Sequence, residues 1–170
     1  MGLVTGACFA EFGVNVTCVD KDENKIKILN QGGMPIFEPG LKELMAKNVQ
    51  EGRLKFTTDA ESAIRKALVI FIAVGTPSDG NGRADLKYVR QVANAIAQDL
   101  NGYKVIATKS TVPVGTGEMI AQIIRDKQVS AYGFDVVSNP EFLREGTAVH
   151  DFHNPAKTVH RSTKLCCLSI

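Results

Sequence analysis

The sequence predicts an α/β protein built around a parallel β-sheet. Short apolar runs of strand length alternate with longer segments of helical apolar spacing, which is the pattern of successive strand–helix–strand units. Three apolar runs, over 68–74, 104–109 and 134–137, are followed by small, hydroxylated or acidic residues. Ligands of open α/β sheets bind at the carboxyl ends of the strands. The sequence therefore also predicts a polar rim suited to a cofactor.

Strand and helix signals follow one another through the first half of the chain. Residues 2–10 have a helical pattern, and 15–20 alternate in polarity before ending in the acid Asp20. A helix over 23–30 is expected to stop at the two glycines that follow it. The other elements expected here are a short helix over 38–47, a strand over 54–57, and a helix that Asp59 caps and that ends at Lys66.

The second half continues the alternation. The continuous apolar run 68–74 predicts a strand buried on both faces, and 79–83 is a turn. Asp85 is expected to cap a helix, since apolar residues follow it at helical spacing. Those residues are Leu86, Val89, Ala93, Ile96, Ala97 and Leu100. The remaining expected elements are strands over 104–109 and 134–137 and a helix over 117–126.

Length and composition are those of one globular domain. At 170 residues, with 44% hydrophobic and 22% charged residues, the chain can bury a genuine core. The net charge of +2, without a basic cluster interleaved with aromatic residues, argues against nucleic acid as a partner. No apolar run reaches the length of a membrane span. We therefore expect a cytoplasmic protein with no nucleic-acid or membrane partner.

The cysteines and histidines give no metal-binding pattern. The cysteines are Cys8, Cys18, Cys166 and Cys167. The first two fall in an apolar helix and an apolar strand, where a small reduced core thiol is the expected role. The pair near the carboxyl end lacks metal-ligand spacing. His150 and His153 lie three apart at a polar junction, where solvated side chains are more common than metal ligands. No metal site is predicted.

Two groups of acids have both a functional and an ordinary interpretation. Glu141 and Glu145 follow the 134–137 strand and lie four apart, on one face of a helical turn. An ordinary strand-to-helix junction gives the same pattern. Asp20 at the end of its strand could accept both hydroxyls of an adenosine ribose and repel a 2′-phosphate, which favours NAD over NADP. Alternatively, Asp20 is a turn acid that simply ends a strand.

Three longer motifs resemble the amino-terminal domain of the UDP-glucose/GDP-mannose dehydrogenase family. They are Val-Gly-Thr-Pro-Ser at 74–78, Lys-Ser-Thr-Val-Pro-Val-Gly at 109–115 and Asn-Pro-Glu-Phe-Leu-Arg-Glu-Gly at 139–146. The UDP-glucose 6-dehydrogenase branch is the most similar, because 36–41 and 52–59 also match it. The GDP-mannose 6-dehydrogenase branch remains the alternative within the family.

The resemblance implies a Rossmann-like doubly wound parallel sheet whose first strand is missing. Gly2 resembles the last glycine of the Gly-x-Gly-x-x-Gly fingerprint, so the strand and the two glycines that should precede it are absent. Losing that strand should expose the edges of its two neighbours. The expected organisation is an NAD-binding domain over 1–155, incomplete at its amino end, followed by an irregular divergent tail over 156–170. Both ends are interpreted as signs of a fragment.

The resemblance also assigns roles to residues, with NAD as the cofactor. The cofactor-binding residues it implies are Gly2, Asp20, Lys25, Val74, Thr76, Pro77, Ser110, Thr111 and Glu145. The residues it implies for the nucleotide sugar are Glu141, Phe142, Leu143, Arg144 and Glu145. Thr111 and Glu141 are the implied catalytic pair. Thr111 helps to position the water of a final hydrolysis, and Glu141 assists proton transfer to or from that water.

The implied reaction oxidises the primary alcohol of UDP-glucose to an acid in two hydride transfers, with two NAD consumed. It needs a thiolate that captures the aldehyde, and in the family this thiolate lies in later domains. The isolated chain is therefore predicted to be inactive. UDP-glucose is the expected partner, and a homo-oligomer is allowed. The alternative from another functional class is a non-catalytic module that binds a nucleotide or associates with a full-length enzyme.

Overall fold

The computed structural model describes residues 2–78, 80, 82–140, 142–155 and 161–162. The chain forms two compact units. The first comprises Met1–Ala63 and Phe142–Lys157, and the second comprises Ile64–Glu141 and Thr158–Ile170. Each unit is therefore described by itself. No helix within the described ranges is both long enough and apolar enough to cross a membrane.

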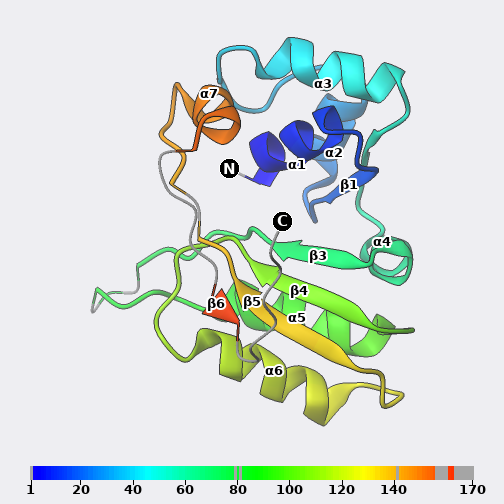
Figure 1. Ribbon diagram of the computed structural model, residues 1–170, viewed down its shortest axis with the longest axis vertical. Helices are drawn as coiled ribbons and strands as arrows, with labels where there is room; N and C mark the ends of the chain where they lie inside the picture. Colours follow the sequence, from blue (N-terminus) through cyan, green and yellow to red (C-terminus); the bar gives the residue numbers. More distant parts are fainter. Residues whose placement is uncertain (1, 79, 81, 141, 156–160, 163–170) are drawn as a thin grey trace. The chain divides into compact units, whose positions relative to one another are not determined.

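In the first unit, helices pack around a two-stranded parallel sheet (Figure 1). Its elements are α1 (Gly2–Glu11), β1 (Val16–Val19), α2 (Glu23–Asn30), α3 (Leu41–Gln50), β2 (Leu54–Thr57) and α7 (Ala148–His153). The register runs from Val16 opposite Leu54 to Val19 opposite Thr57. The core consists of Val4, Ala7, Cys8, Ala10, Ile26, Leu29, Leu41, Met45, Leu54, Phe56 and Ala148. Helix α4 (Ala60–Lys66) contains the boundary between the two units.

Helix α1 approaches β1 closely at Gly6. A Cβ atom added to Gly6 would lie 2.6 Å from Cys18 Sγ and 3.4 Å from Val16 Cγ1. Only a residue without a side chain therefore allows this separation between helix and strand. This role of Gly6 was not predicted, although a glycine four residues after Gly2 on a helix is a signal for close packing.

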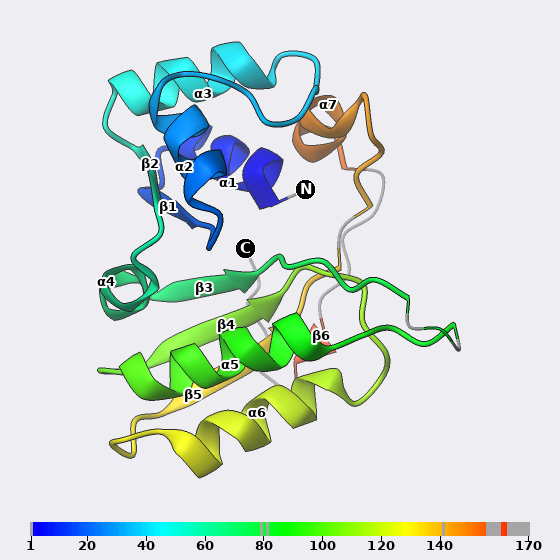
Figure 2. The ribbon, with the colours of Figure 1, turned by 180° about the vertical axis from the view of Figure 1, so that it is seen from behind.

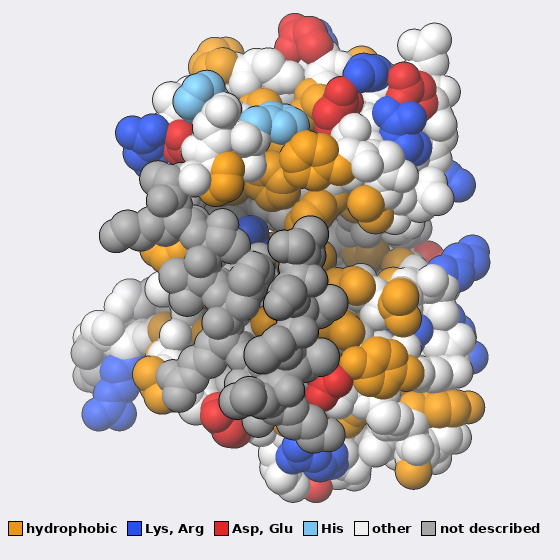
Figure 3. All heavy atoms as spheres, viewed as in Figure 1, with side chains coloured by type: hydrophobic (Ala, Val, Ile, Leu, Met, Phe, Trp, Pro, Cys, Tyr) orange, Lys and Arg blue, Asp and Glu red, His pale blue; other side chains and the backbone are white. Residues whose placement is uncertain are grey.

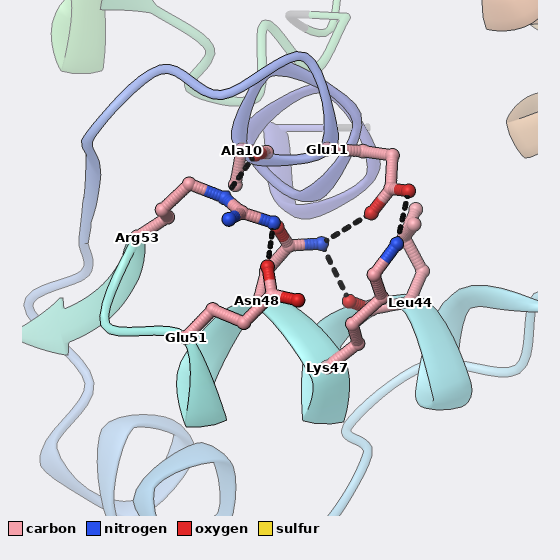
Figure 4. Close-up of polar contacts among 7 residues, drawn as sticks. All are labelled: Ala10, Glu11, Leu44, Lys47, Asn48, Glu51 and Arg53. Carbon is pink, nitrogen blue, oxygen red and sulfur yellow. Dashed lines mark hydrogen bonds and ion pairs between the residues drawn. The ribbon is translucent and has the colours of Figure 1, made fainter.

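A buried polar network joins the carboxyl end of α1 to α3 and to the start of β2 (Figure 4). Asn48, which is fully buried, donates to Glu11 Oε2 at 2.9 Å and to the Leu44 carbonyl at 2.8 Å. Arg53 donates from Nη2 to Asn48 Oδ1 at 2.9 Å and from Nε to the Ala10 carbonyl at 2.9 Å. The Ala10 carbonyl also accepts from the Gly13 amide at 3.0 Å, so the guanidinium adds a second donor at the end of α1.

Two ion pairs flank this network. Lys47 Nζ lies 2.6 Å from Glu11 Oε1, and the guanidinium of Arg53 contacts Glu51. Hydrogen bonds from Lys47 and Asn48 hold the pKa of Glu11 below its usual value. The carboxylate therefore stays ionised in the folded unit over the neutral range, which keeps the contact between α1 and α3.

The second unit is a four-stranded sheet with α5 and α6 on one face (Figures 1 and 2). Its elements are β3 (Val69–Ile72), α5 (Lys87–Asp99), β4 (Lys104–Thr108), α6 (Thr116–Lys127), β5 (Phe134–Ser138) and β6 (Arg161–Ser162). The order is β3-β4-β5-β6, with parallel pairing except for antiparallel β6. Its fully buried large side chains include Ile72, Val89, Ile96, Ile106, Ile120 and Ile124.

The strand pairing confirms the predicted fold class. A doubly wound sheet has the order 3-2-1-4-5-6. The ladders of the described residues, β2-β1 in the first unit and β3-β4-β5 in the second, each match a run of neighbours in such an order. Val19 on β1 and Val69 on β3 are each 44% exposed. Figure 3 shows apolar side chains open to solvent over the sheet of the second unit.

Several elements differ from those expected. The helix expected over 38–47 is α3 at Leu41–Gln50, because Pro39 and the left-handed Gly40 (φ 76°) keep its start in a turn. Strand β3 is shorter than 68–74, and it is not buried on both faces, since its side chains alternate between exposed and less exposed. Helix α7 and the two-residue β6 were not predicted. By contrast, α2 has the expected bounds, and Asp59 caps α4 through the Ser62 amide at 3.0 Å.

Candidate functional site

The first group of candidate residues lies at the carboxyl end of β1. The backbone N–H of Asp20 donates to the Thr57 carbonyl, which continues the ladder with β2. Asp20 Oδ1 accepts from the Asp22 amide at 3.0 Å, and Oδ2 lies 3.5 Å from Lys25 Nζ. The side chain of Asp20 is 41% exposed. The structure thus brings the predicted Asp20 and Lys25 together and leaves carboxylate oxygen available to hydroxyl donors.

Lys25 reaches Asp20 because of how α2 begins. Asp22 caps this helix by accepting from the amides of Asn24 and Lys25 at 3.0 Å and 3.2 Å. The cap fixes the first turn directly after Asp20, and Lys25 follows at a spacing that returns its side chain to the strand end. Gly2 begins α1 and is half-buried.

The second group joins the loops that follow β3 and β4. Ser110 Oγ donates to the Val74 carbonyl at 2.6 Å, and Thr76 Oγ1 donates to the Thr111 carbonyl at 3.2 Å. The structure therefore brings four predicted residues into one hydrogen-bonded pair of loops. Pro77 follows in the same turn, where its carbonyl accepts from the Asp85 amide at 2.8 Å. Thr111 is exposed, so its side chain is accessible to a ligand or a water molecule.

A buried lysine underlies this pair of loops, and the sequence analysis did not assign it a role. Lys109 is 8% exposed, and its Nζ donates to Asn139 Oδ1 at 3.3 Å. The Asn139 amide in turn donates to the Thr108 carbonyl at 2.9 Å. This link ties the carboxyl end of β4 to that of β5. A lysine inside an apolar strand, directly before Ser110, was the available signal.

The third group is the loop that leads into α7. Arg144 donates to Asp151 from Nη2 at 2.8 Å, from Nε at 3.0 Å and from its backbone N–H at 3.1 Å. These bonds hold the pKa of Asp151 far below its usual range. Leu143 packs against the core of the first unit, whereas Phe142 and Glu145 are exposed. Glu141, the other predicted acid, lies outside the described residues.

Glu38 is the main residue of this region that sequence reasoning missed. Its buried carboxylate accepts from the amides of Gly146 and Ala148 at 2.9 Å and 2.8 Å. The available signal was a glutamate in the 36–41 motif between an aromatic residue and a proline.

None of the cysteines and histidines in the described region has the environment of an activated nucleophile. Burial raises the pKa of Cys8 and of Cys18 to about 11, so both thiols stay protonated at neutral pH. This environment is the reverse of the one that activates a cysteine. The two histidines lie in different surroundings, because His150 Nδ1 is 3.8 Å from Asp151 while the His153 ring packs on Phe12. Cys166 and Cys167 lie outside the described residues.

The chemistry of the two strand-end groups fits a dinucleotide. A half-exposed carboxylate at the end of β1 can accept hydrogen bonds from a ribose diol. The loops after β3 and β4 offer hydroxyl and backbone groups without a fixed charge, which suits uncharged rings and sugars. Each group by itself therefore has the chemistry to contact part of a nucleotide.

Comparison with known proteins gives a family match over most of the chain. Residues 1–165 match the model of the UDP-glucose/GDP-mannose dehydrogenase family, NAD binding domain. UDP-glucose 6-dehydrogenase TuaD of Bacillus subtilis is 55% identical over 163 residues, which are 96% of this chain and 35% of that protein. A UDP-glucose 6-dehydrogenase of Rhizobium meliloti is 56% identical over 160 residues, 94% of this chain and 36% of that protein. The chain thus spans about a third of these relatives.

Solved structures of two branches are similar to this fold. A UDP-glucose dehydrogenase from Pyrobaculum islandicum superposes with a TM-score of 0.91 at 37% identity, over 96% of this chain and 38% of that one. A GDP-mannose dehydrogenase from Pseudomonas aeruginosa, solved as a ternary complex, gives a TM-score of 0.90 at 38% identity. The match covers 95% of this chain and 38% of that one. Both matches extend over the two units described above.

Proposed function

Because this chain belongs to the UDP-glucose/GDP-mannose dehydrogenase family, matching its NAD binding domain, we propose that it forms the NAD site of a UDP-glucose 6-dehydrogenase. The observation that carries the proposal is the half-exposed Asp20 carboxylate beside Lys25 at the carboxyl end of β1. The names of the two relatives above support the choice of substrate. Residues 1–155 are the proposed domain, in a cytoplasmic protein.

The residues of the first unit would bind the adenosine half of NAD. Asp20 accepts the two ribose hydroxyls and disfavours a 2′-phosphate by charge repulsion. Lys25, already paired with Asp20, lies beside the ribose and adenine. Gly2 belongs to the turn at the start of α1, where helix amides face the pyrophosphate.

The loops of the second unit would also contact the cofactor. Val74, Thr76 and Pro77 line the adenine and ribose, and Ser110 fixes the loop through its bond to Val74. Thr111 contacts NAD and holds the water used in the final hydrolysis through its exposed hydroxyl. This role needs an accessible side chain, which Thr111 has.

The loop before α7 would contact the nucleotide sugar and the nicotinamide half of the cofactor. Phe142, Leu143 and Arg144 contribute backbone groups, while Glu145 reaches the cofactor from an exposed position. The Arg144 N–H already donates to Asp151, and its carbonyl accepts from the Thr147 amide. Glu141 is the proposed acid that exchanges a proton with the hydrolytic water.

NAD, when bound, accepts hydride, and the proposed overall reaction is UDP-glucose, two NAD and water giving UDP-glucuronate and two NADH. Such a reaction needs a thiolate, and the environments of Cys8 and Cys18 exclude them from that role because both thiols remain protonated. The proposed role of the 170-residue chain is therefore to bind and orient the cofactor, without activity of its own.

Calorimetric titration with NAD tests this function. The chain should bind NAD, and Asp20→Asn should weaken binding by roughly tenfold or more, because a charged hydrogen-bond acceptor is lost. The matched control is Glu43→Gln, which removes an exposed carboxylate on α3 and should leave the affinity unchanged. Absence of NAD binding by the folded wild-type chain would refute the proposal and favour a non-catalytic association module, including a homo-oligomer.

A second candidate is the NAD-binding domain of a GDP-mannose 6-dehydrogenase. The observation that favours it is the TM-score of 0.90 at 38% identity to the enzyme from Pseudomonas aeruginosa. Titration of the NAD-loaded chain with UDP-glucose and with GDP-mannose separates the two candidates. Heat released only with GDP-mannose would replace the first proposal by the second.

A further inference from the structure

Glu38 is a buried carboxylate whose two oxygens are both used by one distant loop. It is 8% exposed, although the neighbouring Phe37 is 93% exposed. Oε2 accepts from the Gly146 amide at 2.9 Å, and Oε1 accepts from the Ala148 amide at 2.8 Å. A buried carboxylate is unfavourable unless it is hydrogen-bonded, and bonds from N–H to an ionised acceptor are the stronger ones. Both amides are therefore held firmly.

The backbone around Glu38 is shaped to bring this side chain inward. The Glu38 carbonyl accepts from the Leu41 amide at 3.2 Å, and Gly40 at φ 76° adopts the left-handed conformation that favours glycine. Leu41 then enters the core with no exposed surface. The turn thus anchors one side of Glu38, and α3 begins directly after it.

The loop that Glu38 holds is fixed at further points. Asp151 accepts from Arg144 and from the Thr147 hydroxyl at 3.1 Å. Helix α7 lies against α1, with the rings of Phe9 and Phe152 edge to face at 5.3 Å. The Thr147 side chain accepts no hydrogen bond from the amides at the start of α7, so the Glu38 carboxylate supplies the acceptor that a local cap would otherwise give. Between these fixed points, Glu145 stays exposed.

We propose that Glu38 is a positioning residue for cofactor binding. By fixing the Gly146 and Ala148 amides, it sets the conformation of the 142–147 loop and so the position from which Glu145 meets NAD. The inference rests on the proposed function, because the contact of Glu145 with NAD is part of that function. Glu38 itself touches neither cofactor nor substrate in this assignment and acts through the loop.

Amide hydrogen exchange in the full 170-residue chain tests the contact. Glu38→Gln keeps the size of the side chain but replaces one acceptor oxygen by an NH₂ donor, so at most one of the two amides keeps its partner. Exchange should rise by at least about tenfold at Gly146, at Ala148 or at both, with no change in the β1–β2 ladder. The control Glu43→Gln should change neither. If Glu38→Gln leaves both exchange rates at the wild-type values, the proposal is wrong.

A double-mutant cycle on NAD affinity tests the positioning role. Glu38→Gln and Glu145→Gln should each weaken NAD binding by about fivefold, and together by little more than either alone, because both act through one contact. Additive losses, or an unchanged affinity in Glu38→Gln despite faster exchange, would reduce Glu38 to a purely structural cap and overturn the proposal.

The experiments still give a decision if the Glu38→Gln variant does not fold or if the wild-type chain binds no NAD. If Glu38→Gln does not fold, Glu38→Asp replaces it in both arms, since the shorter acid keeps the charge but cannot span both amides, and the same outcomes decide. If the wild-type chain binds no NAD, the proposed function fails and the positioning role fails with it. In that case the exchange rates still establish whether Glu38 holds the loop, so the two failures are distinguished.

Discussion

Asn48 lies between Glu11 and Arg53 and uses both ends of its amide, donating to the carboxylate at 2.9 Å and accepting from the guanidinium at 2.9 Å. This single side chain therefore connects the end of α1, the last turn of α3 and the residue before β2 (Figure 4). Because it is fully buried, water cannot replace its bonds when it is removed.

Replacing Asn48 by alanine should destabilise the protein. The substitution removes the bonds that the Asn48 side chain makes with Glu11 Oε2 and with the Arg53 guanidinium, and a lost buried hydrogen bond of this kind costs about 1–3 kcal/mol. We expect a loss of about 2 kcal/mol or more in the free energy of unfolding, measured in urea. The control Asn24→Ala changes an exposed position on α2 and should stay within about 0.5 kcal/mol of the wild type. Equal losses in both variants would contradict the role of the network.

A methyl group should be tolerated at one helical glycine and not at another. Gly6→Ala places a Cβ 2.6 Å from Cys18 Sγ, and such overpacking costs about 1–3 kcal/mol. Gly117→Ala meets only Val136 Cγ1 at 3.8 Å, so it should be neutral or stabilise α6 by up to about 1 kcal/mol. Thermal unfolding of both variants compares them directly. Adding Cys18→Ala should restore part of the loss in Gly6→Ala, and failure to do so would exclude this contact as the cause.

The pairing of Arg144 with Asp151 should depend on pH in a defined direction. The Arg144 guanidinium holds the pKa of Asp151 below its ordinary value of 3.8. Folding therefore favours the ionised acid, and this stabilisation is fully present above pH 3.8 and is lost as the pH falls through the folded-state pKa. The difference in unfolding free energy between wild type and Asp151→Asn should stay constant from about pH 7 to about pH 5 and shrink in stronger acid. A difference that grows on acidification would contradict this assignment.

The two core thiols should be unreactive in the folded protein. Because burial raises the pKa of Cys8 and Cys18 to about 11, iodoacetamide should modify neither at neutral pH until the chain unfolds. The experiment is made in a variant with Cys166→Ser and Cys167→Ser, so that mass spectrometry reports only these two. Rapid labelling of folded protein at pH near 7 would show that one of the thiols is activated.

Alternation of apolar runs and helical segments was sufficient to predict the fold class. It also identified α2 and the region of every parallel strand, since short-range pattern determines such elements. The bounds of α3 were misplaced because the left-handed Gly40 delays its start, which no periodicity reveals. The apolar run wrongly predicted that β3 is buried on both faces. Whether a strand is buried depends on its neighbours in the fold, which the run itself does not reveal.

The candidate site could be predicted only in part, because sequence patterns reveal local structure but not contacts between distant segments. Residues at strand ends, such as Asp20 and Thr76, follow from the position of each strand in the sequence. Glu38 and Lys109 were missed because their partners are far along the chain, at Ala148 and Asn139. Their roles arise from tertiary contacts, and the local signals, a glutamate within the 36–41 motif and a lysine directly before Ser110, do not identify those partners.

The bond between Glu38 and the Ala148 amide spans 110 positions of the chain. Closing so large a loop has an entropic cost that must be met before the contact forms, and contacts of this kind slow folding. During synthesis, α1, α2 and α3 can gather around the β1–β2 pair while Glu38 still lacks its partners. The first unit therefore reaches its native arrangement only after the intervening segment has left the ribosome, which makes the loop before α7 a late-forming part of the molecule.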